Sequence, residues 1–274
     1  MTANGQKMFV AFGDMLGFGS LVLENEDTNT ERLRNENTEW ARHEQKFKLA
    51  NASLEQLYDG KDTPSLERQF NHFHRALSRR FDAATFKLES VVFSDSFFIA
   101  SDDGNGLLAF LPHLMQEMIL NLVPIRVGVA EGSFCLNEMK TAFKATSHDF
   151  SVQFLGKGVV RAVKAESKGL KGVRVALHSS AIEALNLGSP VAVPVPGNER
   201  TNHCEYEFNY LIPFLTDPLD ATSMKDILTG IEIMRSVAPD EIQKEHFAPT
   251  TEALKRLTEE FSQAAAKPGS DSVK

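Results

Sequence analysis

The sequence predicts an α+β fold in which a central, mostly antiparallel sheet is flanked by helices. Apolar runs rich in Val and Phe, typical of buried strands, occupy residues 7–13, 88–100 and 125–134. The segments between them space their apolar residues as helices do. Strand, helix, paired strands, helix, strand is the ferredoxin-like order, so one sheet is expected to collect these runs.

Three helices are expected between the strands. The first ends near residue 84, and its core-facing residues recur at i, i+3 and i+4: Phe70, Phe73, Leu77 and Phe81. The second covers 105–122 and is expected to be interrupted at Pro112, which lacks a backbone donor. The third covers 158–168 and leads into a strand over Val173–Leu177.

The chain is expected to divide into a main domain, an extension and a tail. The main domain covers 1–185, and within it 24–84 form a charged helical insertion followed by the first core helix. The extension over 186–263 contains a strand at YEFNYLIPF and helices at about 222–238 and 239–263, packed on the main domain. Residues 264–274 are polar and small, which predicts a disordered tail.

Composition favours a cytoplasmic protein. The 274-residue chain carries a net charge of -8, which argues against a broad nucleic-acid surface. No apolar run reaches the ~18 residues that a membrane helix needs, and no signal segment opens the chain. Cys135 and Cys204 lack CxxC spacing, so neither a disulfide framework nor a zinc site is expected. We therefore expect no membrane and no nucleic-acid partner.

Two aspartates, Asp14 and Asp95, each follow an apolar strand-like run. Burying a carboxylate beside Phe12 or Phe93 costs several kcal/mol unless a cation or donors compensate. If adjacent strands bring both acids together, their repulsion raises that cost until a divalent cation enters. Each acid alone is more typical of a turn or cap residue, but as a pair they predict a hard-metal site of the kind that carries phosphates.

Four blocks of sequence, in order, resemble the class III nucleotide cyclase catalytic domain. They are Asp14–Phe18, Ser94–Ala100, Ile125–Gly132 and Phe154–Ala181. The resemblance covers residues 6–23 and about 85–185. It implies the cyclase fold, with the insertion and the extension added to it.

The resemblance also implies a reaction and a set of ligands. A nucleoside triphosphate would be converted to its 3′,5′-cyclic nucleotide and pyrophosphate with two divalent ions, Mn²⁺ or Mg²⁺. Asp14, Asp95 and the Met15 carbonyl would hold the ions. The backbone N–H groups that would meet the phosphates are those of Leu16, Gly17, Phe18 and Gly19.

Basic residues recur along the predicted third helix, where phosphate charge needs cations. They are Lys157, Arg161, Lys164 and Lys168, expected opposite Val160 and Val163. Such a stripe is also typical of a solvated face. Many cyclases place an Asn and a transition-state Arg on this helix, and those positions hold Val160 and Lys164 here. The resemblance thus implies Lys164 as the catalytic cation, with Arg161, one position after Val160, as the other candidate.

The residues that read the base also differ from both purine cyclase patterns. Val91 and Gln153 stand where adenylate cyclases carry Lys and Asp and guanylate cyclases carry Glu and a small residue. Val91 makes no hydrogen bond to a base, whereas the Gln153 amide offers a donor and an acceptor. The chain therefore resembles the pyrimidine cyclases of the bacterial Pycsar antiphage system, which implies UTP as the favoured substrate and CTP as the next.

The resemblance further implies a homodimer with active sites at the interface. The cyclic product would act on a separate effector that forms no stable complex with the cyclase. Two other functions fit the same sequence. One is a catalytically degenerate domain that binds a nucleotide or a partner, as the missing Asn allows, and the other is a purine (adenylate) cyclase.

Overall fold

The computed structural model describes residues 6–19, 22, 66–140, 150–216, 221–238 and 241–266. The predicted insertion over 24–63 lies outside these residues. The expected tail lies outside them from residue 267 onward, whereas residues 264–266 belong to the last helix. Among the described residues, none of the helices combines the length and apolarity needed to cross a membrane.

The predicted α+β fold is confirmed. The strands pair in the order β2-β3-β1-β4-β6-β8-β7, and β5 adds to the far end of β4. Only the β4–β6 pair among them is parallel. The strands are β1 (Gln6–Met15), β2 (Glu89–Val92), β3 (Ser96–Ser101), β4 (Ile125–Lys140), β5 (Phe150–Leu155), β6 (Val175–Leu177), β7 (Ala192–Pro194) and β8 (Tyr206–Phe208).

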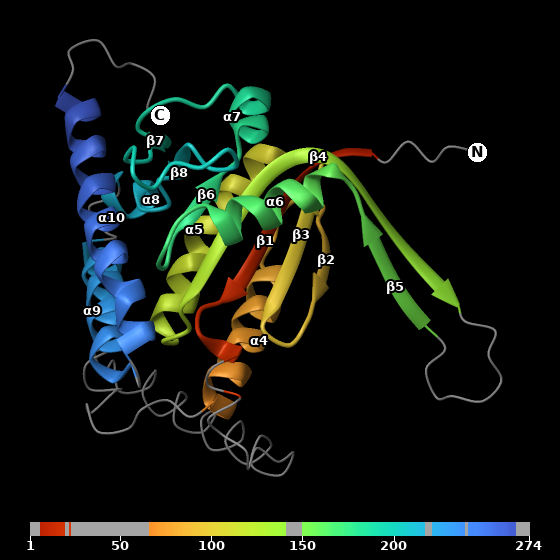
Figure 1. Cartoon of the computed structure of the whole chain (residues 1–274), viewed down its shortest axis with the longest axis horizontal. Coiled ribbons are helices and arrows are strands. Elements are labelled where there is room, and N and C mark those ends of the chain that lie inside the picture. The colour runs from red at the N-terminus through yellow and green to blue at the C-terminus, as the bar shows by residue number, and fades with distance from the viewer. Residues whose placement is uncertain are drawn as a thin grey trace.

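Helices cover both faces of this sheet (Figure 1). The helices α4 (Leu66–Asp82) and α5 (Gly104–Leu120) enclose the larger core, where Phe73 and Leu111 meet Ala11. The helix α6 (Lys157–Lys168) covers the opposite face. Because side chains alternate along a strand, even-numbered residues of β1 face α6 and odd-numbered ones face the larger core.

Four further helices follow α6 in the part of the chain that the structure describes. They are α7 (Ser179–Leu185), α8 (Ile212–Thr216), α9 (Ala221–Val237) and α10 (Glu241–Ala266). The last two correspond closely to the two predicted C-terminal helices. Figure 1 shows them side by side along one flank of the molecule.

Strand β4 is longer than predicted. The apolar run ends at residue 134, but β4 continues to Lys140 and pairs there with β5, from Cys135 opposite Leu155 to Lys140 opposite Phe150. Figure 1 shows these two segments as an arm that projects beyond the helix-covered sheet. An arm without a covering layer needs no continuous apolar run, and this explains why the sequence pattern did not predict it.

Two predictions about proline-containing segments are wrong. Helix α5 runs without a break through Pro112, because buried residues on both sides of the proline hold the helix against the core. The strand expected over YEFNYLIPF ends at Phe208, and α8 begins at Ile212. Pro213 lies in the first turn of α8, a position that needs no N–H donor and that proline favours.

The C-terminal segment continues the main sheet. Strand β8 pairs with β6, and β7 pairs with β8. Next to this junction the side chain of Arg174 is only 1% exposed and donates to Glu207 through Nε and Nη2, both at 2.9 Å. Arg256 of α10 also pairs with Glu207. Buried charges need such partners, so the network ties α10 to the sheet.

Helix α6 lies close to the sheet because the residues on both surfaces are small where they meet. Its buried residues are mostly small and include Gly158, Ala162 and Ala165. A Cβ at Gly128 of β4 would lie 2.2 Å from the Ala162 carbonyl oxygen, and one at Gly132 would lie 2.5 Å from the Gly158 nitrogen. Both obstacles are backbone atoms, so side chains at these glycines would push α6 off the sheet.

Gly128→Ala is therefore expected to lower the free energy of unfolding by about 1–3 kcal/mol or more, the usual cost of overpacking a core. Gly197→Ala is the matched control, since a Cβ there meets nothing within 4 Å. Urea denaturation of both variants measures the difference. Equal stability of the two variants would contradict the close packing of α6.

Candidate functional site

Asp14 lies near the end of β1, between two strands. Its neighbours in register are Ser96 of β3 on one side and Arg126 of β4 on the other. The Ser96 hydroxyl donates a hydrogen bond of 2.6 Å to Asp14 Oδ1. By the alternation of β1, the carboxylate lies on the same face as Val10 and Phe12, the face that α6 covers.

Asp95 lies in the tight turn between β2 and β3. Its carbonyl accepts a hydrogen bond of 2.9 Å from the N–H of Met15, the residue after Asp14. Its carboxylate accepts one of 2.8 Å from the Ser94 hydroxyl. The β1–β3 pairing therefore brings together the two acids that the sequence predicts as a pair, each with a neighbouring serine as a donor.

The electrostatics of Asp14 show that the pair of acids lacks compensating positive charge. Burial raises the pKa of Asp14 most, and the negative charge of Asp95 raises it further, whereas the Ser96 hydrogen bond and Arg126 lower it. The net effect raises the pKa of Asp14 above its ordinary value, so the negative charge of the ionised pair is only partly compensated. The positive charge of a divalent cation would offset both causes of the shift, and the two carboxylates with the Met15 carbonyl are oxygen ligands that suit it. The residues present therefore fit Mg²⁺ or Mn²⁺.

The described residues contain no group of three or more His, Cys, Asp or Glu side chains placed to hold a metal ion. A pair of carboxylates is sufficient for Mg²⁺, which usually keeps several waters and takes its other ligands from substrate phosphates. The site therefore suits a cation that arrives with a nucleotide better than one caged by protein.

Arg126 belongs to the site although the sequence patterns did not predict it. Its Nε donates to Glu166 of α6 at 2.7 Å, and its Nη1 donates to the Leu170 carbonyl at 3.0 Å. Glu166 is 3% exposed, and burial raises its pKa despite the neighbouring Arg126. A glutamate on the inner face of α6 opposite an arginine in an apolar strand was the available signal. With Asp95 the site holds three carboxylates and this one guanidinium, which leaves it net negative.

The residues expected to bind phosphate form a turn after Asp14. Gly17 has φ 76°, a value that favours glycine, and a helical turn begins at Phe18. A Cβ at Gly19 would meet nothing within 4 Å, so the space beside it is open. The N–H of Leu16, however, donates to the Pro124 carbonyl at 2.8 Å. Of the four N–H groups expected to meet phosphates, that of Leu16 is therefore already bonded within the protein.

The two candidate cations of α6 differ in their surroundings. Arg161 Nη1 donates to the Glu131 carbonyl of β4 at 2.8 Å, so this guanidinium is bound to its own sheet. Lys164 is half-buried and lies one turn after Val160. Among the described residues, the charges that shift the pKa of Asp14 are Asp95 and Arg126, and Lys164 is not one of them. Lys164 therefore has no resolved effect on the charge of Asp14 within one chain.

The orientation predicted for Val160 is wrong. It was expected opposite the basic residues, but it is 53% exposed and shares the outer face of α6 with Lys164. The inner face is occupied instead by the small residues that fit the glycines of β4. An exposed valine beside a half-buried lysine gives α6 a partly apolar outer surface.

The two expected base-reading residues lie on different parts of the sheet. Val91 lies on β2 opposite Phe98, and Gln153 lies on β5 opposite Asn137. The side chain of Gln153 lies outside the described residues. Phe154, the residue after Gln153, links the two regions: its ring lies 5.6 Å from that of Phe93 and 4.8 Å from that of Phe98.

This phenylalanine contact was not predicted, and part of it faces solvent. Phe93 is 39% exposed, and Leu155 at the base of the arm is 66% exposed. Val160 of α6 is exposed as well. Exposed apolar side chains can stack on a flat base or contact another protein.

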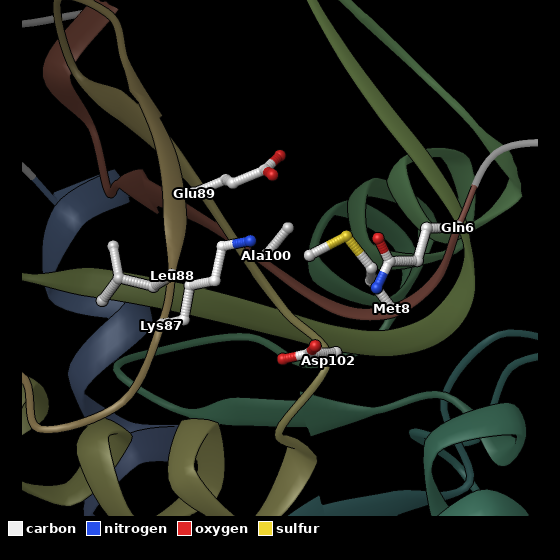
Figure 2. A pocket seen from close by; sticks show the side chains of 7 residues that line it. All are labelled: Gln6, Met8, Lys87, Leu88, Glu89, Ala100 and Asp102. Atoms are coloured by element: carbon white, nitrogen blue, oxygen red, sulfur yellow. The ribbon is translucent and has the colours of Figure 1, made fainter.

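Figure 2 shows a small hollow on the α6 side of the sheet. It is lined by Gln6, Met8, Lys87, Leu88, Glu89, Ala100 and Asp102. Gln6 and Asp14 stand near opposite ends of β1, so the hollow is separate from the acids. Its charged lining residues are one cation, Lys87, and two acids, Glu89 and Asp102, and we assign no chemistry to it.

No family model and no curated protein sequence matches this chain. Similar solved structures include the guanylyl cyclase Cya2, at 12% identity over 75% of this chain and 94% of that one, with a TM-score of 0.46. The adenylyl cyclase CyaB from P. aeruginosa has 13% identity over 74% and 93%, with a TM-score of 0.44. A class III adenylyl cyclase-like ATP-binding protein from Pseudomonas aeruginosa has 12% identity over 81% and 40%, with a TM-score of 0.46. Because these TM-scores lie below 0.5, activity has to be inferred from the chain's own residues.

Proposed function

We propose that this protein is a nucleotide cyclase that converts a pyrimidine nucleoside triphosphate, UTP in preference to CTP, into its 3′,5′-cyclic nucleotide and pyrophosphate. The observation that carries the proposal is the meeting of Asp14 and Asp95 at the β1–β3 pairing, where burial and mutual repulsion raise the pKa of Asp14. A site that is short of positive charge suits a metal-bound triphosphate.

The reaction requires little covalent chemistry from the protein. The ribose 3′-oxygen forms a bond to the α-phosphorus, the bond from that phosphorus to the bridging oxygen breaks, and the 3′-hydroxyl proton passes to water. The divalent ions would lower the pKa of the attacking hydroxyl and neutralise triphosphate charge. Asp14, Asp95 and the Met15 carbonyl would hold those ions, and the turn over Gly17–Gly19 would bind phosphate oxygens.

Positive charge for the transition state would come from Lys164. Arg161 is the weaker candidate because its guanidinium is bound to the Glu131 carbonyl. Since Lys164 is not among the charges that shift the Asp14 pKa within the chain, we propose that it acts on the acids of a second copy. The exposed Val160 on the same face of α6 suits such a homodimer interface.

Val91 and Gln153 are the proposed base-reading residues. Val91 is half-buried and offers no hydrogen bond, so the lysine that would read adenine is missing. The Gln153 amide matches uracil or cytosine by a flip. The phenylalanines in contact with Phe154 would add apolar walls, which would suit a pyrimidine better than a purine.

The base preference is tested by incubating the pure protein with each of the four ribonucleoside triphosphates and Mn²⁺, with the products separated by chromatography. We expect cyclic UMP to exceed cyclic CMP, and both to exceed the purine products. Val91→Lys combined with Gln153→Asp is expected to shift the preference toward ATP. Abundant cyclic AMP from the unmodified protein would refute the pyrimidine assignment.

A cyclic pyrimidine nucleotide made by a cytoplasmic enzyme would act as a second messenger. We propose a role in antiphage defence, with a separate effector that binds the product and is not held in a stable complex. Comparing the survival of phage-challenged cells that carry the cyclase with that of cells that carry the Asp95→Asn variant tests this role.

Val160 favours one other function. It occupies the position at which many cyclases carry an asparagine, so a domain that binds nucleotide without turnover also fits. Nucleotide-dependent thermal stabilisation without any cyclic product in the four-nucleotide assay would identify this module.

A further inference from the structure

Helix α4 contacts the hairpin that carries Asp95. The Nε2 atom of His74 lies 2.9 Å from the carbonyl oxygen of Ser94, the residue immediately before that acid. A carbonyl oxygen only accepts hydrogen bonds, so Nε2 carries the proton and donates it. The bond spans two elements that are distant in sequence, and it fixes the main chain at the start of the turn.

Helix α4 also contacts the turn that follows the other acid. Phe70, one helical turn before His74, stacks on Phe18 with ring centroids 6.0 Å apart and packs on the His74 ring at 4.4 Å. Phe18 belongs to the turn proposed to bind phosphate. One face of α4 therefore supports both halves of the proposed site.

The His74 ring has a fixed orientation. Phe73 meets it edge-on at 5.2 Å with an interplanar angle of 90°, and Phe73 itself packs at 6.1 Å on Phe97 of β3. With Phe70 on its other side, the imidazole has little freedom to leave the Ser94 carbonyl. A rigid donor of this kind is suited to hold a loop in one position.

The negative charge of Asp14 repels Asp95 in the hairpin turn, so a bond that holds this turn in place opposes the repulsion. The charge of Asp95 raises the pKa of Asp14, which shows that the two carboxylates repel each other when ionised. The turn has two other main-chain bonds, from the Phe93 N–H to the Ser96 carbonyl at 2.8 Å and from the Met15 N–H to the Asp95 carbonyl at 2.9 Å. The His74 bond is its link to the helix layer.

We propose that His74 is a positioning residue that holds the Asp95 turn in its metal-binding position and, through Phe70, couples this turn to the turn at Phe18. This proposal rests on the proposed function, because it assumes that Asp95 is a metal ligand. His74 touches neither metal nor substrate and acts through the Ser94 carbonyl.

The test separates the hydrogen bond from the packing of the ring. His74→Phe retains an aromatic ring against Phe70 and Phe73 but has no donor. His74→Gln offers an amide donor in place of Nε2 and serves as the rescue variant. His113→Phe is the matched control, because His113 of α5 also packs edge-on against a phenylalanine, Phe214 at 5.9 Å, away from the acids.

Two readouts are compared on the full chain. The first is hydrogen exchange of the Phe93 and Met15 amides without metal, which is expected to accelerate about 10-fold in His74→Phe, the effect of losing one hydrogen bond. The second is Mn²⁺ affinity by calorimetric titration, expected to weaken about 10- to 100-fold, as for lost support of a metal ligand. Both should recover in His74→Gln and stay unchanged in His113→Phe.

Three outcomes of these measurements decide whether His74 holds the turn and whether Asp95 binds metal. Unchanged exchange and unchanged Mn²⁺ affinity in a folded His74→Phe protein would overturn the proposal. Equal losses in His74→Gln and His74→Phe would assign the effect to packing and overturn it as well. If Asp95→Asn leaves Mn²⁺ binding unaffected, the proposed function fails, but the metal-free exchange measurement still decides whether His74 holds the turn.

Discussion

Asp14→Asn is expected to reduce cyclisation by about 10³-fold or more while leaving the fold intact, because it removes a ligand of ions that stabilise transition-state charge. The asparagine oxygen still accepts the Ser96 hydrogen bond, so the change removes charge and little else. Turnover is measured with UTP and Mn²⁺. Asp102→Asn is the control, an exposed acid that follows the opposite end of β3.

The stability of the metal-free protein has a definite dependence on pH. Because the folded pKa of Asp14 is raised, the folded state holds this proton more tightly than the unfolded chain does. The wild type therefore loses stability relative to Asp14→Asn as the pH rises from the ordinary value through the raised one. Above that range Mn²⁺ should raise the melting temperature of the wild type only. A variant with near-normal turnover, or with the same response to Mn²⁺, would refute the role of Asp14 as a metal ligand.

The sequence predicted the parts of the fold that depend on apolar periodicity. The strand at 7–13, the hairpin around Asp95 and the helix at 158–168 all lie where the pattern places them. Such elements bury one whole face, so their residues must alternate or recur at helical spacing. The sequence could predict that Asp14 and Asp95 lie near each other, because each acid follows an apolar strand-like run and the two runs pair.

The arm and the supporting residues depend on tertiary contacts and had no such signal. The pairing of β4 with β5, from Cys135 to Lys140, lies beyond the apolar run that ends at residue 134. The bond between His74 and Ser94 joins residues that look unremarkable in isolation, and Arg126 acquires its partner only when α6 lies across β4. The glycines that allow this approach were informative only once the position of α6 was known.

The proposed shared site predicts activity from two inactive proteins. Asp95→Ala chains keep Lys164, and Lys164→Ala chains keep both acids. If Lys164 acts on the acids of a second copy, a mixed dimer contains one intact site and one doubly damaged site. Each parent should lose about 10²–10³ in rate, the usual cost of lost transition-state charge stabilisation, so rescue will be visible.

Mixing the two variants under subunit exchange is therefore expected to restore up to half of the wild-type activity per heterodimer, since one site of two works. Differently tagged chains allow the heterodimers to be purified before UTP turnover is measured. Lys168→Ala is the control partner, because this exposed lysine lies in the last turn of α6, and its chains should be active before mixing. Purified Asp95→Ala and Lys164→Ala heterodimers that stay as inactive as their parents would place the acids and Lys164 within one chain. In that case Lys164 would have to reach Asp14 by a movement of α6, and breaking the Arg126–Glu166 pair that anchors α6 beside Asp14 should then change the rate.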